Sequence, residues 1–167
     1  APPTVLHNLD TPTICALNGS AAGYGMDLAL GCDIRIMADS AKLAAAFTAR
    51  GVVPESGGTW ILPRLIGWGK TRELLLTGAN FDAEEALAMH FIEKLVPAAE
   101  LDAWVEVWLD RILAAGPLAV RAQKALIGRW EELDLAAAIE AGIDTFAEVY
   151  ESDEPNRMLA PFMKSKT

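Results

Sequence analysis

The apolar positions in the first third of the chain follow two patterns, one typical of strands and one typical of helices. A short apolar run over 13–18 ends at the pair Asn18-Gly19, which predicts a buried strand followed by a turn. Residues 20–32 then combine small side chains with an apolar helical pattern, and residues 33–38 alternate apolar and polar side chains, as a strand does. This region is therefore expected to form a strand, a turn, a helix and a strand.

Helical periodicity governs most of the chain that follows. Asp82 is expected to cap a helix over 83–89, because acids at positions 84 and 85 suit the first turn of a helix. Residues 92–96 form the last strand-like run. The remaining helices are expected over 59–66, 70–77, 101–115, 117–130 and 133–150, with a last one that ends near Met163. We therefore divide the chain into an α/β part over residues 1–100 and a helical part over residues 101–167.

Composition and charge narrow the class of protein. Of the 167 residues 52% are hydrophobic, which favours a folded domain that associates with copies of itself. A net charge of −9 argues against a nucleic-acid partner, and no apolar run is long enough for a membrane span. Cys15 and Cys32 form no C-x-x-C pair, so neither a disulfide framework nor a metal knuckle is predicted. We expect a cytoplasmic protein.

Several short motifs fail to predict a known type of site. Gly23-Tyr24-Gly25 lacks the third glycine of a dinucleotide fingerprint, because Leu28 occupies that position. His7 has no suitably spaced Cys, His or carboxylate with which to bind a metal ion. The same holds for His90, so no metal site is expected.

The turn after the first strand predicts an anion or oxyanion site. A helix that begins within residues 19–25 would present free NH groups, and its glycines would let a ligand approach the backbone. A tight turn whose glycines serve only packing is the alternative interpretation.

Three separated motifs resemble the enoyl-CoA hydratase/isomerase (crotonase) family, in that family's order and spacing. They are PTICALNGSAAGYGMDLALGCDIRI from Pro12, GVVPESGGTWILPRLIG from Gly51 and ELLLTG from Glu73. The resemblance implies an α/β fold, namely a crotonase-like ββα spiral core with a C-terminal α-helical region that mediates trimer contacts. It also implies a homotrimer or hexamer. The chain starts at Ala1-Pro2-Pro3 without a Met, so we expect its core to be incomplete at the N-terminus.

The resemblance implies an acyl-CoA thioester as the substrate, with no cofactor beyond the CoA that the substrate carries. The backbone NH of Tyr24 maps to one donor of the family's oxyanion hole, and the second donor belongs to a segment upstream of this chain. His90 stands where the family usually has Gly. Candidate substrate-binding residues near the oxyanion turn and in the final helix are Ala22, Gly23, Phe47, Pro54, Phe162 and Lys164.

The acidic residues point to a choice of reactions. Hydratases of the family use two glutamates, which map to Asp27 and to Phe47, and a phenylalanine cannot transfer a proton. Glu55 resembles the base of Δ3,Δ2-enoyl-CoA isomerases and the acid of phenylacetate-pathway ring-expanding isomerases, so a double-bond isomerase is the preferred prediction. The alternatives are a hydratase that uses Asp27 and Glu55, and a non-catalytic acyl-CoA-binding protein. Either acid would also suit a helix N-terminus without any chemistry.

Overall fold

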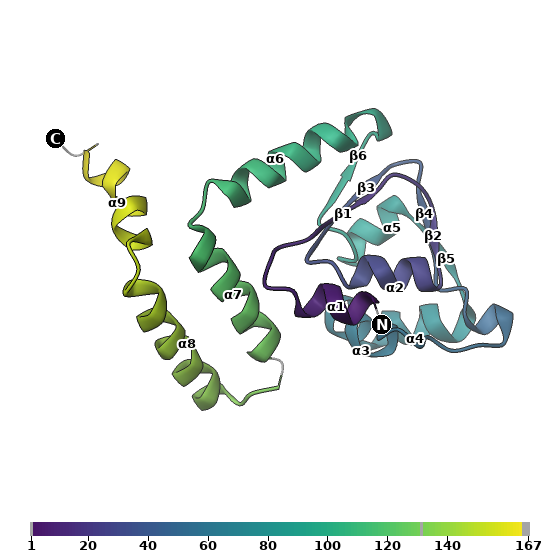
Figure 1. Ribbon diagram of the computed structural model, residues 1–167. Coiled ribbons are helices and arrows are strands. Elements are labelled where there is room, and N and C mark those ends of the chain that lie inside the picture. Colours follow the sequence, from purple (N-terminus) through teal and green to yellow (C-terminus); the bar gives the residue numbers. More distant parts are fainter. Residues whose placement is uncertain (1, 131, 165–167) are drawn as a thin grey trace. The chain divides into compact units, whose positions relative to one another are not determined.

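The computed structural model describes residues 2–130 and 132–164 of the chain (Figure 1). The chain divides into two compact units. Unit 1 comprises residues 1–7 and 13–107, and unit 2 comprises residues 8–12 and 108–167.

Short strands of unit 1 form two three-stranded sheets within the described residues. The first sheet is wholly parallel, in the order β1 (Ile14–Leu17), β3 (Ile34–Ala38) and β6 (Lys94–Val96). In the second, β2 (Ala21–Ala22) pairs in parallel with β4 (Lys42–Ala44), which pairs antiparallel with β5 (Asn80–Asp82). The chain alternates between the two sheets from β1 to β4, then adds β5 to the second sheet and β6 to the first, in keeping with the predicted ββα spiral.

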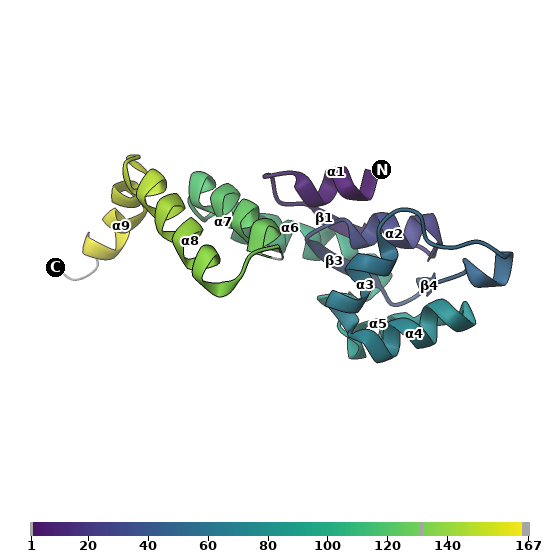
Figure 2. The ribbon, with the colours of Figure 1, turned by 90° about the horizontal axis from the view of Figure 1, so that it is seen from below.

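Helices account for most of the remaining described residues. In unit 1 they are α1 (Pro2–Asn8), α2 (Tyr24–Leu30), α3 (Gly58–Ile66), α4 (Trp68–Thr77) and α5 (Ala83–Ala88), with 3-10 turns η1 (Thr48–Arg50) and η2 (Ala98–Glu100). Helix α6 (Leu101–Leu113) runs across the boundary between the units, and α7 (Pro117–Trp130), α8 (Leu135–Tyr150) and α9 (Glu154–Lys164) follow it. Seen from below, α1 and α4 lie on opposite sides of unit 1 (Figure 2).

Local sequence explains where several of these helices begin. The Asp82 side chain accepts a hydrogen bond from the Glu85 amide, and the Glu85 side chain accepts one from the Asp82 amide, which is a complete capping box. Pro117 begins α7, as its missing NH predicts. Helix α2 is shorter than the helical pattern over 20–32, because Ala21 and Ala22 pair with β4 instead.

The core of unit 1 lies around α2 and the first sheet. Met26 of α2, Ile36 and Met37 of β3 and Phe91 are completely buried. Phe91 also meets Phe81 of β5 edge to face, with ring centroids 5.5 Å apart. Strands from both sheets and the helix that carries the oxyanion turn therefore share one packed interior.

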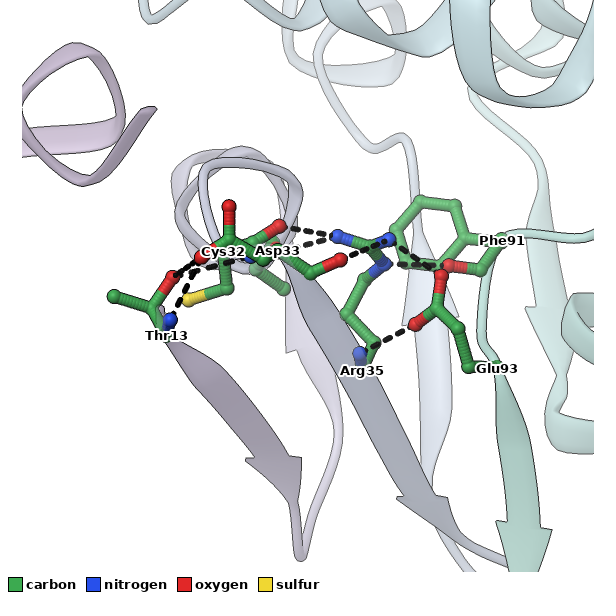
Figure 3. A network of polar contacts seen from close by, with 7 residues as sticks. Thr13, Cys32, Asp33, Arg35, Phe91 and Glu93 are labelled. Carbon is green, nitrogen blue, oxygen red and sulfur yellow. Dashed lines mark hydrogen bonds and ion pairs between the residues drawn. The ribbon is translucent and has the colours of Figure 1, made fainter. Parts of the chain in front are cut away.

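Arg35 links the end of α2 to the first sheet (Figure 3). Its guanidinium is buried, and Nη2 lies 2.7 Å from Oε1 of Glu93. Nε donates to the Phe91 carbonyl at 2.7 Å and Nη1 donates to the Cys32 carbonyl at 2.6 Å. Because the charge is both paired and hydrogen-bonded, its burial is compensated, and the network fixes the chain that leaves α2.

His90 follows α5 in a left-handed backbone conformation with φ of 62°, the positive value that favours glycine. The structure thus explains why Gly suits this position in the family that the sequence resembles.

In unit 2, the carboxylate of Glu154 is buried and caps α7. It accepts hydrogen bonds from the amides of Leu118 and Ala119 at 2.9 and 2.8 Å. Helix α8 packs along α7 and α9 but leaves one side uncovered. We call this side the apolar face of α8, and its residues are Leu135, Ile139, Ile143, Phe146 and Tyr150, each more than half exposed.

Across residues 2–130 and 132–164, no helix combines the length and apolar character needed to cross a bilayer. In the same part of the chain, His, Cys, Asp and Glu side chains form no cluster of three or more that would hold a metal ion.

Candidate active site

The oxyanion turn connects β2 to α2. Gly23 has φ of 54°, a value that side chains other than glycine rarely adopt, and its amide donates to the Ala44 carbonyl at 3.0 Å. Tyr24 is the first residue of α2, so its amide has no acceptor within the helix. The Tyr24 NH, which the family resemblance implies as an oxyanion donor, is therefore free of a helical acceptor and lies next to the exposed Ala22.

Phe47 packs beneath this turn. Its side chain is 5% exposed, and the ring lies 3.7 Å from the point where a Cβ of residue 23 would stand. Phe47, which the family resemblance aligns with the second acid of hydratases, is thus a buried apolar residue.

Asp27 lies in the first turn of α2 and is completely buried. Neither of its carboxylate oxygens has a hydrogen-bond partner of good geometry among the described residues. Burial raises the pKa of this carboxyl to about 6. The nearby Gly58 amide lowers the pKa and the negative charge of Glu55 raises it. Asp27 is therefore a carboxyl that takes up a proton more readily than an ordinary aspartate.

Glu55 lies in the loop between Pro54 and the start of α3, with its side chain exposed. It is close enough to Asp27 for its charge to act on that carboxyl. The loop is followed by Gly57, whose φ of 94° again requires glycine, and by Gly58. The backbone of Gly58 lies so close to Asp27 that a Cβ there would overlap Oδ1.

The structure thus brings together the residues predicted near the oxyanion turn: Ala22, Gly23, Tyr24, Asp27, Phe47, Pro54 and Glu55. The other two candidates, Phe162 and Lys164, lie in α9 of unit 2, and their side chains fall outside the described part of the structure. Sequence reasoning missed Gly58 as the residue against which Asp27 packs. The Gly57-Gly58 pair marks a close backbone approach, but it does not say which side chain approaches.

An apolar cavity of about 310 Å³ adjoins Phe47. It lies between the connection from β4 to α3 and helix α4. Phe47 and Pro54 belong to its wall, together with Trp68, Thr71 and Leu75 of α4. The sequence does not indicate that α4 forms the wall of a cavity, because the spacing of its residues predicts an ordinary amphipathic helix.

Comparison with known proteins places these features in a family context. The sequence profile described as enoyl-CoA hydratase/isomerase matches residues 4–166. The chain is 31% identical over 161 residues to a short-chain-enoyl-CoA hydratase of Clostridium acetobutylicum. The aligned region covers 96% of this chain and 62% of that protein.

Solved structures agree with the sequence comparison. A crystal structure of an enoyl-CoA hydratase from Bacillus anthracis matches with a TM-score of 0.95 and 34% identity, over 98% of this chain and 63% of that chain. A Thermobifida fusca protein in complex with acetoacetyl-CoA matches with a TM-score of 0.83 and 38% identity, over 88% of this chain and 58% of that chain. The chain thus spans less than two thirds of the length of each of these three proteins.

Proposed function

The chain belongs to the enoyl-CoA hydratase/isomerase family, and we propose that it acts on an acyl-CoA thioester as a double-bond isomerase. One observation carries the choice of reaction. The buried ring of Phe47 stands at the second acid position, and Glu55 supplies a carboxylate from the neighbouring loop. A single mobile proton needs only one carboxylate, because the group that removes the proton can also return it.

In the proposed reaction the Tyr24 NH donates a hydrogen bond to the thioester carbonyl oxygen. Glu55 removes a proton from C2 of a 3-enoyl-CoA, and the electron pair moves into a dienolate whose oxygen carries the negative charge. Returning the proton to C4 gives the 2-enoyl-CoA, so the atoms and electrons balance without another reactant. A donor aimed at such developing charge contributes about 2.7 to 4 kcal/mol to the lowering of the barrier.

A hydratase is the second candidate, and the proximity of Asp27 to Glu55 favours it. Two carboxyls with different affinities for a proton can act as acid and base, which is what the addition of water to a 2-enoyl-CoA requires. The complete burial of Asp27 weighs against this candidate, because water must reach the base that activates it.

We assign the CoA thioester itself as the partner of this site and invoke no separate cofactor. The complex of the Thermobifida fusca relative with acetoacetyl-CoA supports a ligand of this class. For the assembly we propose a homotrimer or hexamer. The apolar face of α8 supports it, since large exposed apolar surfaces commonly mark subunit contacts.

Incubation with a 3-enoyl-CoA and a 2-enoyl-CoA, side by side, tests the proposed reaction. An isomerase converts the 3-enoyl-CoA to the 2-enoyl-CoA, and the mass is unchanged. A hydratase converts the 2-enoyl-CoA to a 3-hydroxyacyl-CoA, and the mass increases by that of one water. Binding of either thioester without a product would contradict both enzyme assignments and would leave an acyl-CoA-binding protein.

A further inference from the structure

The two cysteines of the chain come from different elements of unit 1 and meet beside the first sheet. Cys15 lies within β1, and Cys32 follows the end of α2. The Asp33 amide donates to the Thr13 carbonyl at 3.2 Å, which holds the chain after α2 against the start of β1. Figure 3 shows the sulfur of Cys32 beside Thr13. Because Cys15 is two positions beyond Thr13, its side chain points to the same face of the strand.

The two thiol groups interact directly. Cys15 donates a hydrogen bond to the sulfur of Cys32, and the Cys32 thiol donates to the Leu28 carbonyl at 3.9 Å. Both cysteines are half-buried and neither is part of a disulfide, so small solutes have access to a pair of free thiols. Their spacing in the sequence predicts no such pair, because only the return of the chain through α2 brings them together.

The hydrogen bond makes the two thiols chemically unequal. It lowers the pKa of Cys32 to about 7, although burial acts in the opposite direction, and Thr13 and the charge of Arg35 contribute to the lowering. The same hydrogen bond, together with burial, raises the pKa of Cys15. Cys32 is therefore partly ionised at neutral pH, and the thiolate is the form of cysteine that reacts with oxidants.

We propose that Cys15 and Cys32 form a redox-active dithiol, which a small hydroperoxide converts to a reversible disulfide. The Cys32 thiolate attacks the terminal oxygen of the hydroperoxide, so that an S–O bond forms and the O–O bond breaks. The alkoxide leaves and takes a proton from solvent, and Cys32 becomes a sulfenic acid. Cys15 then attacks the Cys32 sulfur. The S–S bond forms, the S–O bond breaks, and the hydroxide leaves with the Cys15 proton as water.

The first step prepares Cys15 for the second. The hydrogen bond to Cys32 and the negative charge of that sulfur both hold the proton on Cys15. A sulfenic acid is neutral, so both effects end once Cys32 is oxidised, and the pKa of Cys15 then falls toward its ordinary value. The two sulfurs together lose two electrons and the hydroperoxide gains them, so no further reactant is needed.

The disulfide would close a loop over residues 16–31, which contains the oxyanion turn and α2. The redox state of the dithiol would thus decide whether both ends of the segment with Tyr24 and Asp27 are held covalently. This inference does not depend on which acyl-CoA reaction the protein catalyses, because it concerns residues outside that chemistry.

The test counts free thiols in the whole chain after treatment with hydrogen peroxide. The protein is unfolded in urea, reacted with N-ethylmaleimide and weighed by mass spectrometry. Because the sequence has two cysteines, the untreated protein should add two maleimides, and the oxidised protein should add none. Reduction with dithiothreitol should restore both. Oxidation of methionine changes the mass but leaves this count unchanged.

Two matched variants test the separate roles of the thiols. Cys15→Ala should stop at a Cys32 sulfenic acid, which dimedone traps, and the pH midpoint for alkylation of Cys32 should rise above 7 because its donor is gone. Cys32→Ala should react with peroxide at least about tenfold more slowly than Cys15→Ala, since Cys15 keeps its proton at neutral pH.

Three results would overturn the inference. The first is a wild-type protein that still adds two maleimides after peroxide treatment, a measurement that needs no variant. The second is a loss of thiols that dithiothreitol does not reverse, because each cysteine would then oxidise alone to a sulfinic acid. The third is a disulfide between two molecules, which would run as a dimer in a non-reducing gel.

Discussion

The carboxyl group of Asp27 lies against the backbone of Gly58, where a Cβ would overlap Oδ1 and stand 2.9 Å from Cγ. This contact joins the first turn of α2 to the first turn of α3, so it fixes the oxyanion turn relative to the loop that carries Glu55. Glycine is required at position 58 because any side chain would displace a buried carboxyl.

Gly58→Ala should therefore destabilise the protein and reduce its activity together. Overpacking of this kind costs about 1 to 3 kcal/mol, which urea denaturation measures as a lower transition midpoint. Gly69→Ala is the matched control, since no atom lies within 4 Å of a Cβ at that helical position. The account of the Asp27 contact fails if the two variants have equal stability.

Asp27→Asn should make the protein more stable at pH 7. Burial raises the pKa of Asp27 to about 6 in the folded protein, above its ordinary value of 3.8, so the folded state binds a proton more tightly than the unfolded state between these values. Stability that depends on this proton is present below about pH 4 and is lost as the pH rises through 6. At pH 7 the buried charge therefore costs as much as about 3 kcal/mol, from about 1.36 kcal/mol per pKa unit.

Urea denaturation of Asp27→Asn and of the wild type at pH 4, 5, 6 and 7 checks this dependence. The difference in unfolding free energy should be largest at pH 7 and should shrink toward pH 4. Asp102→Asn serves as the control, because this acid also lies in the first turn of a helix but is exposed. A difference that is independent of pH for Asp27→Asn would rule out the unpaired charge as its source.

His90→Gly should raise the stability of unit 1 by up to about 1 kcal/mol. A left-handed conformation costs residues other than glycine about 1 to 2 kcal/mol, and the greater freedom of glycine in the unfolded chain offsets part of the gain. His90→Ala retains the unfavourable φ and should show no gain. If thermal denaturation gave both variants the same midpoint, the strain assigned to His90 would be absent.

Arg35→Met should destabilise the protein by about 3 to 5 kcal/mol, since it removes the guanidinium that pairs with Oε1 of Glu93 and donates to two carbonyl groups. Lys70→Met breaks an exposed pair with Glu73 and should cost less than about 1 kcal/mol. Chemical denaturation of the two variants compares them directly. A loss as small in Arg35→Met as in Lys70→Met would show that the network of Figure 3 contributes little to stability.

The sequence predicts the longer helices and the strands of the first sheet, and it misses α1 and the strands of the second sheet. Asp82 and Pro117 mark helix starts through a side-chain cap and a missing amide, signals that are local to the chain. Strand β2 is only Ala21–Ala22, too short for any alternation, and β4 and β5 have three residues each. Such strands are defined by pairing partners distant in the sequence, which a local pattern does not contain.

The sequence indicates which residues form the candidate site, but it does not indicate how buried or how hydrogen-bonded each of them is. The motifs place Asp27 and Glu55 near one turn, and the spiral fold explains their proximity. That Asp27 is completely buried without a partner, whereas Glu55 is exposed, depends on how α3 packs against α2. The cavity wall from α4 is likewise a product of packing, since nothing in the local sequence of Thr71 distinguishes it from a threonine on any helix.

The central claim is that the Glu55 carboxylate moves the proton, and Glu55→Gln tests it most directly. The rate of 3-enoyl-CoA isomerisation by this variant should be at least about 100-fold below that of the wild type, because general base catalysis contributes about 10² to 10⁴. The Kd of a saturated acyl-CoA should stay within about twofold, since glutamine keeps the shape of the side chain. Glu84→Gln, which changes an exposed acid of α5, should isomerise at the wild-type rate. An undiminished rate in Glu55→Gln would contradict the account.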